Sequence, residues 1–147
     1  MPKLLVTGDV HGKYSTWQTI KSLLEPNDAL VVAGDLFSTL YPNLNSPDFQ
    51  PDRIKDEVPN LENPFFYVYG NCDSESFFPG YKHVLTFEYM GIPVFLHHGQ
   101  HYLKHFPFNS GVVIEGHTHM SDLKKDGDLF MLNPGSLSKP RDGIYSY

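Results

Sequence analysis

Short runs of apolar residues alternate along the chain with polar segments that contain glycine. The runs at residues 4–6, 29–33 and 65–69 are rich in Leu, Val, Phe and Tyr and are too short for helices, which predicts buried strands. Between the first two runs, apolar residues recur at helical spacing, which predicts a helix over residues 15–24. A strand, a helix and a second strand in this order indicate a βαβ unit.

The second half of the chain continues the pattern, with further strands predicted at residues 92–96, 111–115, 128–132 and 143–147. Residues 38–64 hold five of the twelve prolines, which predicts a long surface connection with one short helix near residues 51–58. A length of 147 residues is typical of one domain, so we expect a single α/β domain over residues 1–147. Sheets of this class usually bind ligands where their strands end.

Composition narrows the possible functions. The formal net charge of −6 argues against binding of long nucleic acids, because that binding depends on clustered Lys and Arg. One cysteine cannot form an internal disulfide, and the N-terminus lacks a long apolar segment, so we expect a cytoplasmic protein without a membrane span. Six of the eight histidines fall between residues 97 and 119, which is the first indication of metal chemistry.

Polar residues with metal-binding side chains follow five of the predicted strands, in each case close to a glycine. They occur in the motifs Gly8-Asp9-Val10-His11, Gly34-Asp35, Gly70-Asn71, His98-Gly99 and Gly116-His117-Thr118-His119. Each motif alone has an ordinary explanation, such as a turn or a capping carboxylate. Two divalent ions about 3.5–4 Å apart need a bridging carboxylate, several neutral imidazoles and further oxygen donors. The ordered combination supplies this set, and it therefore predicts a two-metal site.

The order of these motifs resembles the calcineurin-like metallophosphoesterases. The strings Gly70-Asn71-Cys72-Asp73, Gly116-His117-Thr118-His119 and Asn133-Pro134-Gly135-Ser136 are similar to those of the small prokaryotic phosphodiesterases in that family, and the resemblance spans residues 3 to about 141. It implies a β-sandwich of two packed mixed sheets flanked by helices. It also implies seven metal ligands, which are Asp9, His11 and His119 at one ion, Asn71, His98 and His117 at a second ion, and Asp35 bridging both.

The resemblance further implies hydrolysis of a small phosphodiester by a hydroxide that bridges the two metal ions. The expected ion is Mn²⁺, and mixed nitrogen and oxygen ligands leave Fe, Zn and Ni open. Two divalent ions, one hydroxide and the carboxylates of Asp9 and Asp35 sum to a charge of about +1. A small phosphate ester would therefore be attracted locally to a protein that is acidic as a whole.

Two residues beside Asn71 are further candidates for catalysis. Many members of the family carry a histidine directly after this asparagine, where the present chain has Cys72. The thiol could donate a proton to the leaving group or serve only in packing, and the sequence leaves both interpretations open. Asp73 is a candidate for orienting a neighbouring imidazole or the loop itself. We interpret His97 as structural and favour a surface position for Arg141 over a phosphate contact.

Three alternatives use the same fold differently. A phosphomonoesterase would share the metal ligands, a nuclease would need more basic surface than this chain has, and a non-catalytic scaffold would not need all seven ligands. Members of the family continue with a further strand after the position of Arg141. We therefore expect a second sheet that is short or completed by a partner chain in a homodimer, which light scattering would detect.

Overall fold

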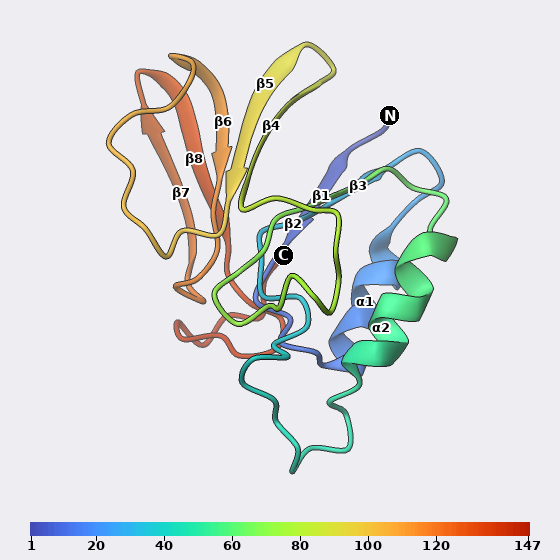
Figure 1. The fold of residues 1–147 in the computed structure, drawn as a ribbon. Coiled ribbons are helices and arrows are strands. Elements are labelled where there is room, and N and C mark those ends of the chain that lie inside the picture. Colours follow the sequence, from blue (N-terminus) through green and yellow to red (C-terminus); the bar gives the residue numbers. More distant parts are fainter.

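The computed structural model describes residues 1–147 and contains two β-sheets that pack face to face, with the helices on one side (Figure 1). The smaller sheet has three parallel strands in the order β1-β2-β3, which are β1 (Leu4–Thr7), β2 (Ala29–Val32) and β3 (Phe65–Tyr67). The larger sheet has the order β4-β5-β6-β8-β7, with β4 (Val84–Tyr89), β5 (Ile92–His97), β6 (Ser110–Ile114), β7 (Ser121–Asp126) and β8 (Asp128–Pro134). The predicted α/β fold with two packed sheets is confirmed, although only the larger sheet is mixed.

The strands of the smaller sheet are buried on both faces. Alternate residues of a strand point to opposite faces, and in β2 the side chains of Leu30 and Val32 pack in the core that includes Trp17, on the helix side. Val31, between them, packs in the second core, which the larger sheet covers. The molecule therefore has three layers, and the central parallel sheet needs the continuous apolar runs seen in the sequence.

Two α-helices cover the outer face of the smaller sheet (Figure 1). Helix α1 (Tyr14–Leu23) joins β1 to β2, as the sequence predicts, and α2 (Pro51–Glu57) lies in the long connection and continues into the short 3₁₀ helix η1 (Val58–Asn60). Proline at the first turn of α2 suits a helix start, because its missing N–H would have no partner there. None of the helices is both long and apolar enough to cross a membrane.

Glu57, at the end of α2, ties the two helices together. Its carboxylate accepts hydrogen bonds from Tyr14 Oη at 2.6 Å and Trp17 Nε1 at 2.9 Å, and it pairs with the ammonium group of Lys21. Burial alone would raise the pKa of Glu57, but the donors from α1 outweigh it and hold the pKa at about 2, below the ordinary 4.5. The carboxylate therefore stabilises the fold through its charged form.

Replacing Glu57 with glutamine should lower the free energy of unfolding at pH 7 by roughly 2 kcal/mol, because charge-assisted hydrogen bonds become neutral ones. A depressed pKa contributes stability that is complete above pH 4.5 and is lost as the pH falls towards about 2. The difference between wild type and Glu57→Gln should therefore shrink between these values. Urea unfolding followed by Trp17 fluorescence measures it, with the exposed Glu62→Gln as control. A difference that does not change with pH would contradict this account.

The strand prediction for residues 143–147 is wrong. Asp142 Oδ1 accepts the N–H of Ile144 at 2.9 Å around a turn in which Gly143 has φ 77°, and no neighbouring strand pairs with the segment. The sequence pattern also does not predict β4 and β7. Every residue of β7 is exposed and offers no apolar alternation, whereas β4 does alternate and could have been found from that signal.

The parallel strands end in register, which brings their loops to one edge. Thr7, Val32 and Tyr67 are paired across β1, β2 and β3. In the larger sheet, Leu96 of β5 pairs in parallel with Ile114 of β6 close to the ends of both strands. The five loops that carry the predicted metal ligands begin directly after these five strands.

Candidate metal centre

All seven predicted ligands meet where these loops converge. Oxygen and nitrogen atoms of Asp9, His11 and His119 lie within 4.8 Å of one another, and so do those of Asp9, Asp35 and His98. The remaining two side chains join the second group, because Asn71 Oδ1 lies 3.0 Å from His98 Nε2 and 3.1 Å from His117 Nδ1. The residues therefore form two adjacent sets that share carboxylates.

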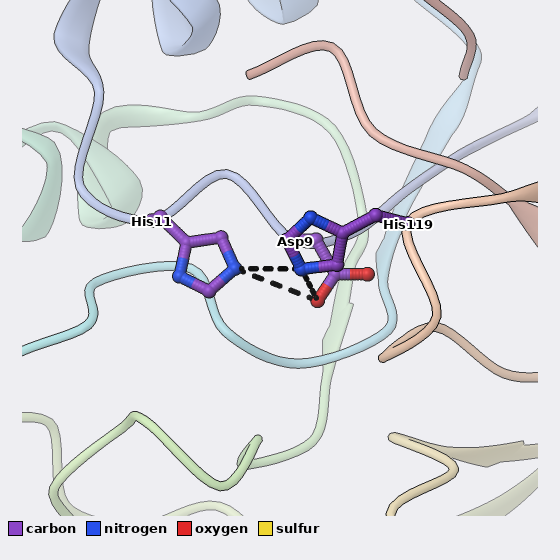
Figure 2. Close-up of side chains that lie close together, drawn as sticks. All are labelled: Asp9, His11 and His119. Atoms are coloured by element: carbon purple, nitrogen blue, oxygen red, sulfur yellow. Dashed lines mark hydrogen bonds and ion pairs between the residues drawn. The ribbon is translucent and has the colours of Figure 1, made fainter. Parts of the chain in front are cut away.

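Figure 2 shows the first set, in which three polar atoms face a common point. Asp9 Oδ1 lies 3.4 Å from His119 Nε2 and 3.7 Å from His11 Nε2, and the two imidazole nitrogens are 3.1 Å apart. Asp9 Oδ1 is completely buried and has no hydrogen-bond partner. A buried carboxylate oxygen without a partner is costly, and a cation held between it and the two imidazoles would remove that cost.

Asp35 lies between the two sets. Its Oδ2 is 3.2 Å from His98 Nε2 and 3.8 Å from His11 Nε2, which belong to different sets. Its other oxygen, Oδ1, accepts the backbone N–H of Cys72 at 2.8 Å and so fixes the carboxylate. This position fits a carboxylate that bridges two ions.

In three of the ligand histidines, a hydrogen bond at ring nitrogen Nδ1 leaves the other ring nitrogen, Nε2, free to bind metal. His98 Nδ1 donates to the carbonyl of Ala33 at 2.7 Å, and His119 Nδ1 donates to the carbonyl of Lys139 at 2.8 Å. A proton on Nδ1 puts the lone pair on Nε2, which points into the site. His11 has the same arrangement, with Ser38 Oγ as the hydrogen-bond partner of its Nδ1.

Electrostatics favour charged carboxylates and a neutral ligand histidine. Burial would raise the pKa of Asp9, but the facing imidazoles of His11, His119 and His98 outweigh it and hold the pKa at about 2. The pKa of Asp35 is lowered for the same reason, with His98 as its main partner. Burial and the neighbouring His98 lower the pKa of His117. For His98 burial would lower the pKa, but Asp35 and Asp9 outweigh it and raise the pKa, and Asp9 raises the pKa of His119. Divalent ions bind carboxylates in the anionic form and imidazoles in the neutral form, so metal binding would displace protons from these two histidines.

Unusual backbone conformations gather at this site. Of the seven non-glycine residues with positive φ, five are predicted ligands and a sixth is Ser38; the five are Asp9, His11, Asp35, His117 and His119. Each such residue costs on the order of 1–2 kcal/mol, which the surrounding structure must offset. The clustering of strain indicates a site whose geometry is fixed for function and not for stability.

Two glycines of the motifs make room for ligands of neighbouring strands. A Cβ on Gly70 would lie 2.0 Å from Asp35 Oδ1, and a Cβ on Gly34 would lie 2.5 Å from His98 Nδ1. Any other residue would displace the ligand. The glycines that mark the motifs in the sequence therefore serve close packing at the site.

The remaining candidates have distinct positions. Cys72 is partly buried beside Asp35. Asp73 is buried and accepts hydrogen bonds from backbone N–H groups, so it holds the loops and contacts no imidazole directly. His97 is buried with its Nε2 3.0 Å from Glu115 Oε2, away from the metal ligands. The side chain of Arg141 is exposed, as expected.

Sequence reasoning misses Ser38, the hydrogen-bond partner of His11. The hydroxyl is buried with φ 56° at its own backbone, and Asp73 Oδ1 accepts its N–H at 3.1 Å. The chain of contacts from Asp73 through Ser38 to His11 sets the direction of the imidazole. No sequence signal marks this serine, because the two residues are 27 positions apart.

Replacing Ser38 with glycine should weaken Mn²⁺ binding by about 10–100-fold, the usual effect of losing a partner behind a metal ligand. The free energy of unfolding should change by less than about 1 kcal/mol, because glycine adopts positive φ without strain. Ser38→Ala removes the same hydroxyl but keeps the strained conformation, so it should show the same affinity loss with lower stability. Calorimetric titration of metal-free protein and urea unfolding measure the two effects. Unchanged Mn²⁺ affinity in both variants would exclude this role for Ser38.

The sequence model of the calcineurin-like phosphoesterase superfamily domain matches residues 3–147. The chain belongs to this family. Phosphodiesterase YfcE of Escherichia coli K12 is 28% identical over 156 residues, covering 97% of this chain and 83% of the relative. A probable metallophosphoesterase of Mycoplasma pneumoniae is also 28% identical, with 97% and 83% of the two chains covered.

Solved structures agree with this assignment. The structure of YfcE, described as a phosphoesterase from E. coli, has a TM-score of 0.79 at 26% identity and covers 96% of this chain and 83% of its own. Vacuolar Protein Sorting 29 from Cryptosporidium parvum has a TM-score of 0.64 at 17% identity, with 92% and 74% covered, which shows the shared fold alone. The chain is a metal-dependent phosphoesterase.

Proposed function

We propose that the chain hydrolyses a small phosphodiester with two divalent ions, expected to be Mn²⁺, held by the seven ligands. The observation that carries the proposal is the position of Asp35 Oδ2, which faces His98 Nε2 at 3.2 Å in one set and His11 Nε2 at 3.8 Å in the other. When bound, two such ions supply Lewis acidity that activates water and neutralises phosphoryl oxygens. The similarity to a phosphodiesterase favours a diester over a monoester.

The ligand residues keep the loaded site positively charged. Only Asp9 and Asp35 contribute negative charge, because Asn71 offers a neutral amide oxygen, 3.0 Å from His98 Nε2. Two divalent ions would exceed the charge of these two carboxylates. The site can therefore attract a phosphate ester although the chain carries a net charge of −6.

The thiol of Cys72 is poorly suited to protonate a leaving group. Burial and the nearby Asp35 carboxylate raise the pKa of Cys72 to about 12. An effective general acid has a pKa near the working pH, so we favour packing as the role of this residue. Diesters with good leaving groups should therefore react fastest, because these groups leave without a proton.

The test is hydrolysis of bis-p-nitrophenyl phosphate by metal-stripped protein, with Mn²⁺, Zn²⁺ or Ni²⁺ added back separately. We expect Mn²⁺ to restore turnover, at a higher rate than with the monoester p-nitrophenyl phosphate under the same conditions. Turnover of the monoester alone would replace the proposal with a phosphomonoesterase. Two bound ions without turnover of either compound would favour a non-catalytic scaffold.

A further inference from the structure

A small hollow lies directly beside the metal centre, next to His11. It has a volume of about 170 Å³, and its walls come from three separate parts of the chain. Lys13 follows the first ligand loop, Lys139 lies on the segment that holds His119, and Asn43 and Ser46 belong to the long connection after β2. The long connection, predicted from the sequence only as a surface segment, thus lines a cavity beside the metal centre.

The hollow collects positive charge that has no partner. Lys13 and Lys139 are both exposed, and neither ammonium group forms an ion pair, whereas Lys3, Lys21, Arg53 and Lys124 all pair with carboxylates. Arg141, whose backbone N–H donates to the carbonyl of His119 at 3.0 Å, is a further exposed cation on the same segment but does not line the hollow. In a chain with a net charge of −6, two unpaired lysines that line the same hollow are a specific feature.

The acidic groups nearby form no ion pair with Lys13 or Lys139. Asp48 lies next to the lining residue Phe49, and both of its carboxylate oxygens are used by Ser15, from the backbone N–H at 2.9 Å and from the hydroxyl at 2.5 Å. Asp9 and Asp35 are buried in the metal centre and would be neutralised by bound ions. The hollow therefore presents ammonium, amide and hydroxyl donors to solvent, a combination that binds phosphate groups.

We propose that this hollow binds a second phosphate group of the substrate, so that the natural substrate is a phosphodiester carrying a further phosphate on the side of His11. This inference rests on the proposed phosphodiesterase activity. The hollow shares His11 with the first ligand set. A phosphate group bound there would therefore be joined to the scissile phosphate through a short part of the same substrate molecule. Lys13 and Lys139 bind the second phosphate, and Asn43 and Ser46 orient it.

A matched pair of substrates tests the proposal. Thymidine 5′-(p-nitrophenyl phosphate) and the same compound with a 3′-phosphate differ only in the second anionic group. With the Mn²⁺-loaded enzyme, we expect kcat/KM to be about tenfold higher for the compound with the 3′-phosphate, and the preference to fall as salt is added. In Lys13→Met/Lys139→Met the ratio of the two kcat/KM values should fall to about one.

The control is Lys82→Met/Lys104→Met, which removes two exposed lysines that form no ion pair and lie outside the hollow. This variant should keep the tenfold ratio. Titration of inorganic phosphate into metal-free protein measures the affinity of the hollow for phosphate without turnover. This affinity should fall at least fivefold in the Lys13/Lys139 variant only. A wild-type ratio near one, or equal phosphate binding by all variants, would overturn the inference. Failure to hydrolyse bis-p-nitrophenyl phosphate would instead overturn the proposed function.

Discussion

Replacing Asp35 with asparagine should reduce Mn²⁺-dependent hydrolysis of bis-p-nitrophenyl phosphate by about 10³-fold or more. Asparagine keeps the shape of the side chain and the oxygen that accepts the Cys72 N–H at 2.8 Å. It removes the negative charge that faces both ligand sets, from His98 Nε2 at 3.2 Å to His11 Nε2 at 3.8 Å. The substitution therefore removes the charge shared by the two metal positions and leaves the packing nearly unchanged.

Metal content separates this effect from misfolding. Elemental analysis after dialysis should find fewer than two ions per chain in Asp35→Asn, and the variant should melt at or above the temperature of metal-free wild type. Asp56→Asn, an exposed carboxylate on α2, serves as the matched control and should keep both activity and metal content. Full activity in Asp35→Asn would exclude a bridging role for this carboxylate.

The sequence predicts the layout of the site because each ligand is positioned by the strand that directly precedes it in the chain. Each ligand follows a short apolar strand, and parallel strands that end in register deliver their loops to one edge, as Thr7, Val32 and Tyr67 do. A motif such as Gly34-Asp35 therefore encodes position as well as chemistry. The convergence of all seven ligand residues follows from this rule.

The parts that the sequence does not predict depend on partners far away in the chain. Ser38 acts on His11 through a buried hydroxyl, and nothing about a serine after Phe37 distinguishes it from an ordinary turn residue. The strand β7 has no apolar face to predict it, and it is held in place by its antiparallel pairing with β8. Lys13 and Lys139 form one hollow only because the loops after β1 and β8 meet. Such features need the folded chain.

Asp73 should have the largest effect on stability of any residue in these loops. Its Oδ1 accepts the N–H groups of Phe37 at 3.0 Å and Ser38 at 3.1 Å, and its Oδ2 accepts those of Leu36 and Gly70, both at 3.2 Å. A fifth hydrogen bond comes from the hydroxyl of a buried tyrosine, at 2.6 Å. The carboxylate therefore joins the loop after β2 to the loop after β3, and it accepts all five of these hydrogen bonds.

Asp73→Asn should lower the free energy of unfolding by about 3–5 kcal/mol, because an amide in either orientation points its own N–H₂ at two or more donors. Tyr67→Phe removes one donor and leaves the carboxylate with the other four, so it should cost only about 1–2 kcal/mol. Urea unfolding followed by far-UV circular dichroism gives both values. If Asp73→Asn cost no more than Tyr67→Phe, the backbone donors would be satisfied without the charge, and the loops that place Asp35 and Ser38 would be held by other contacts.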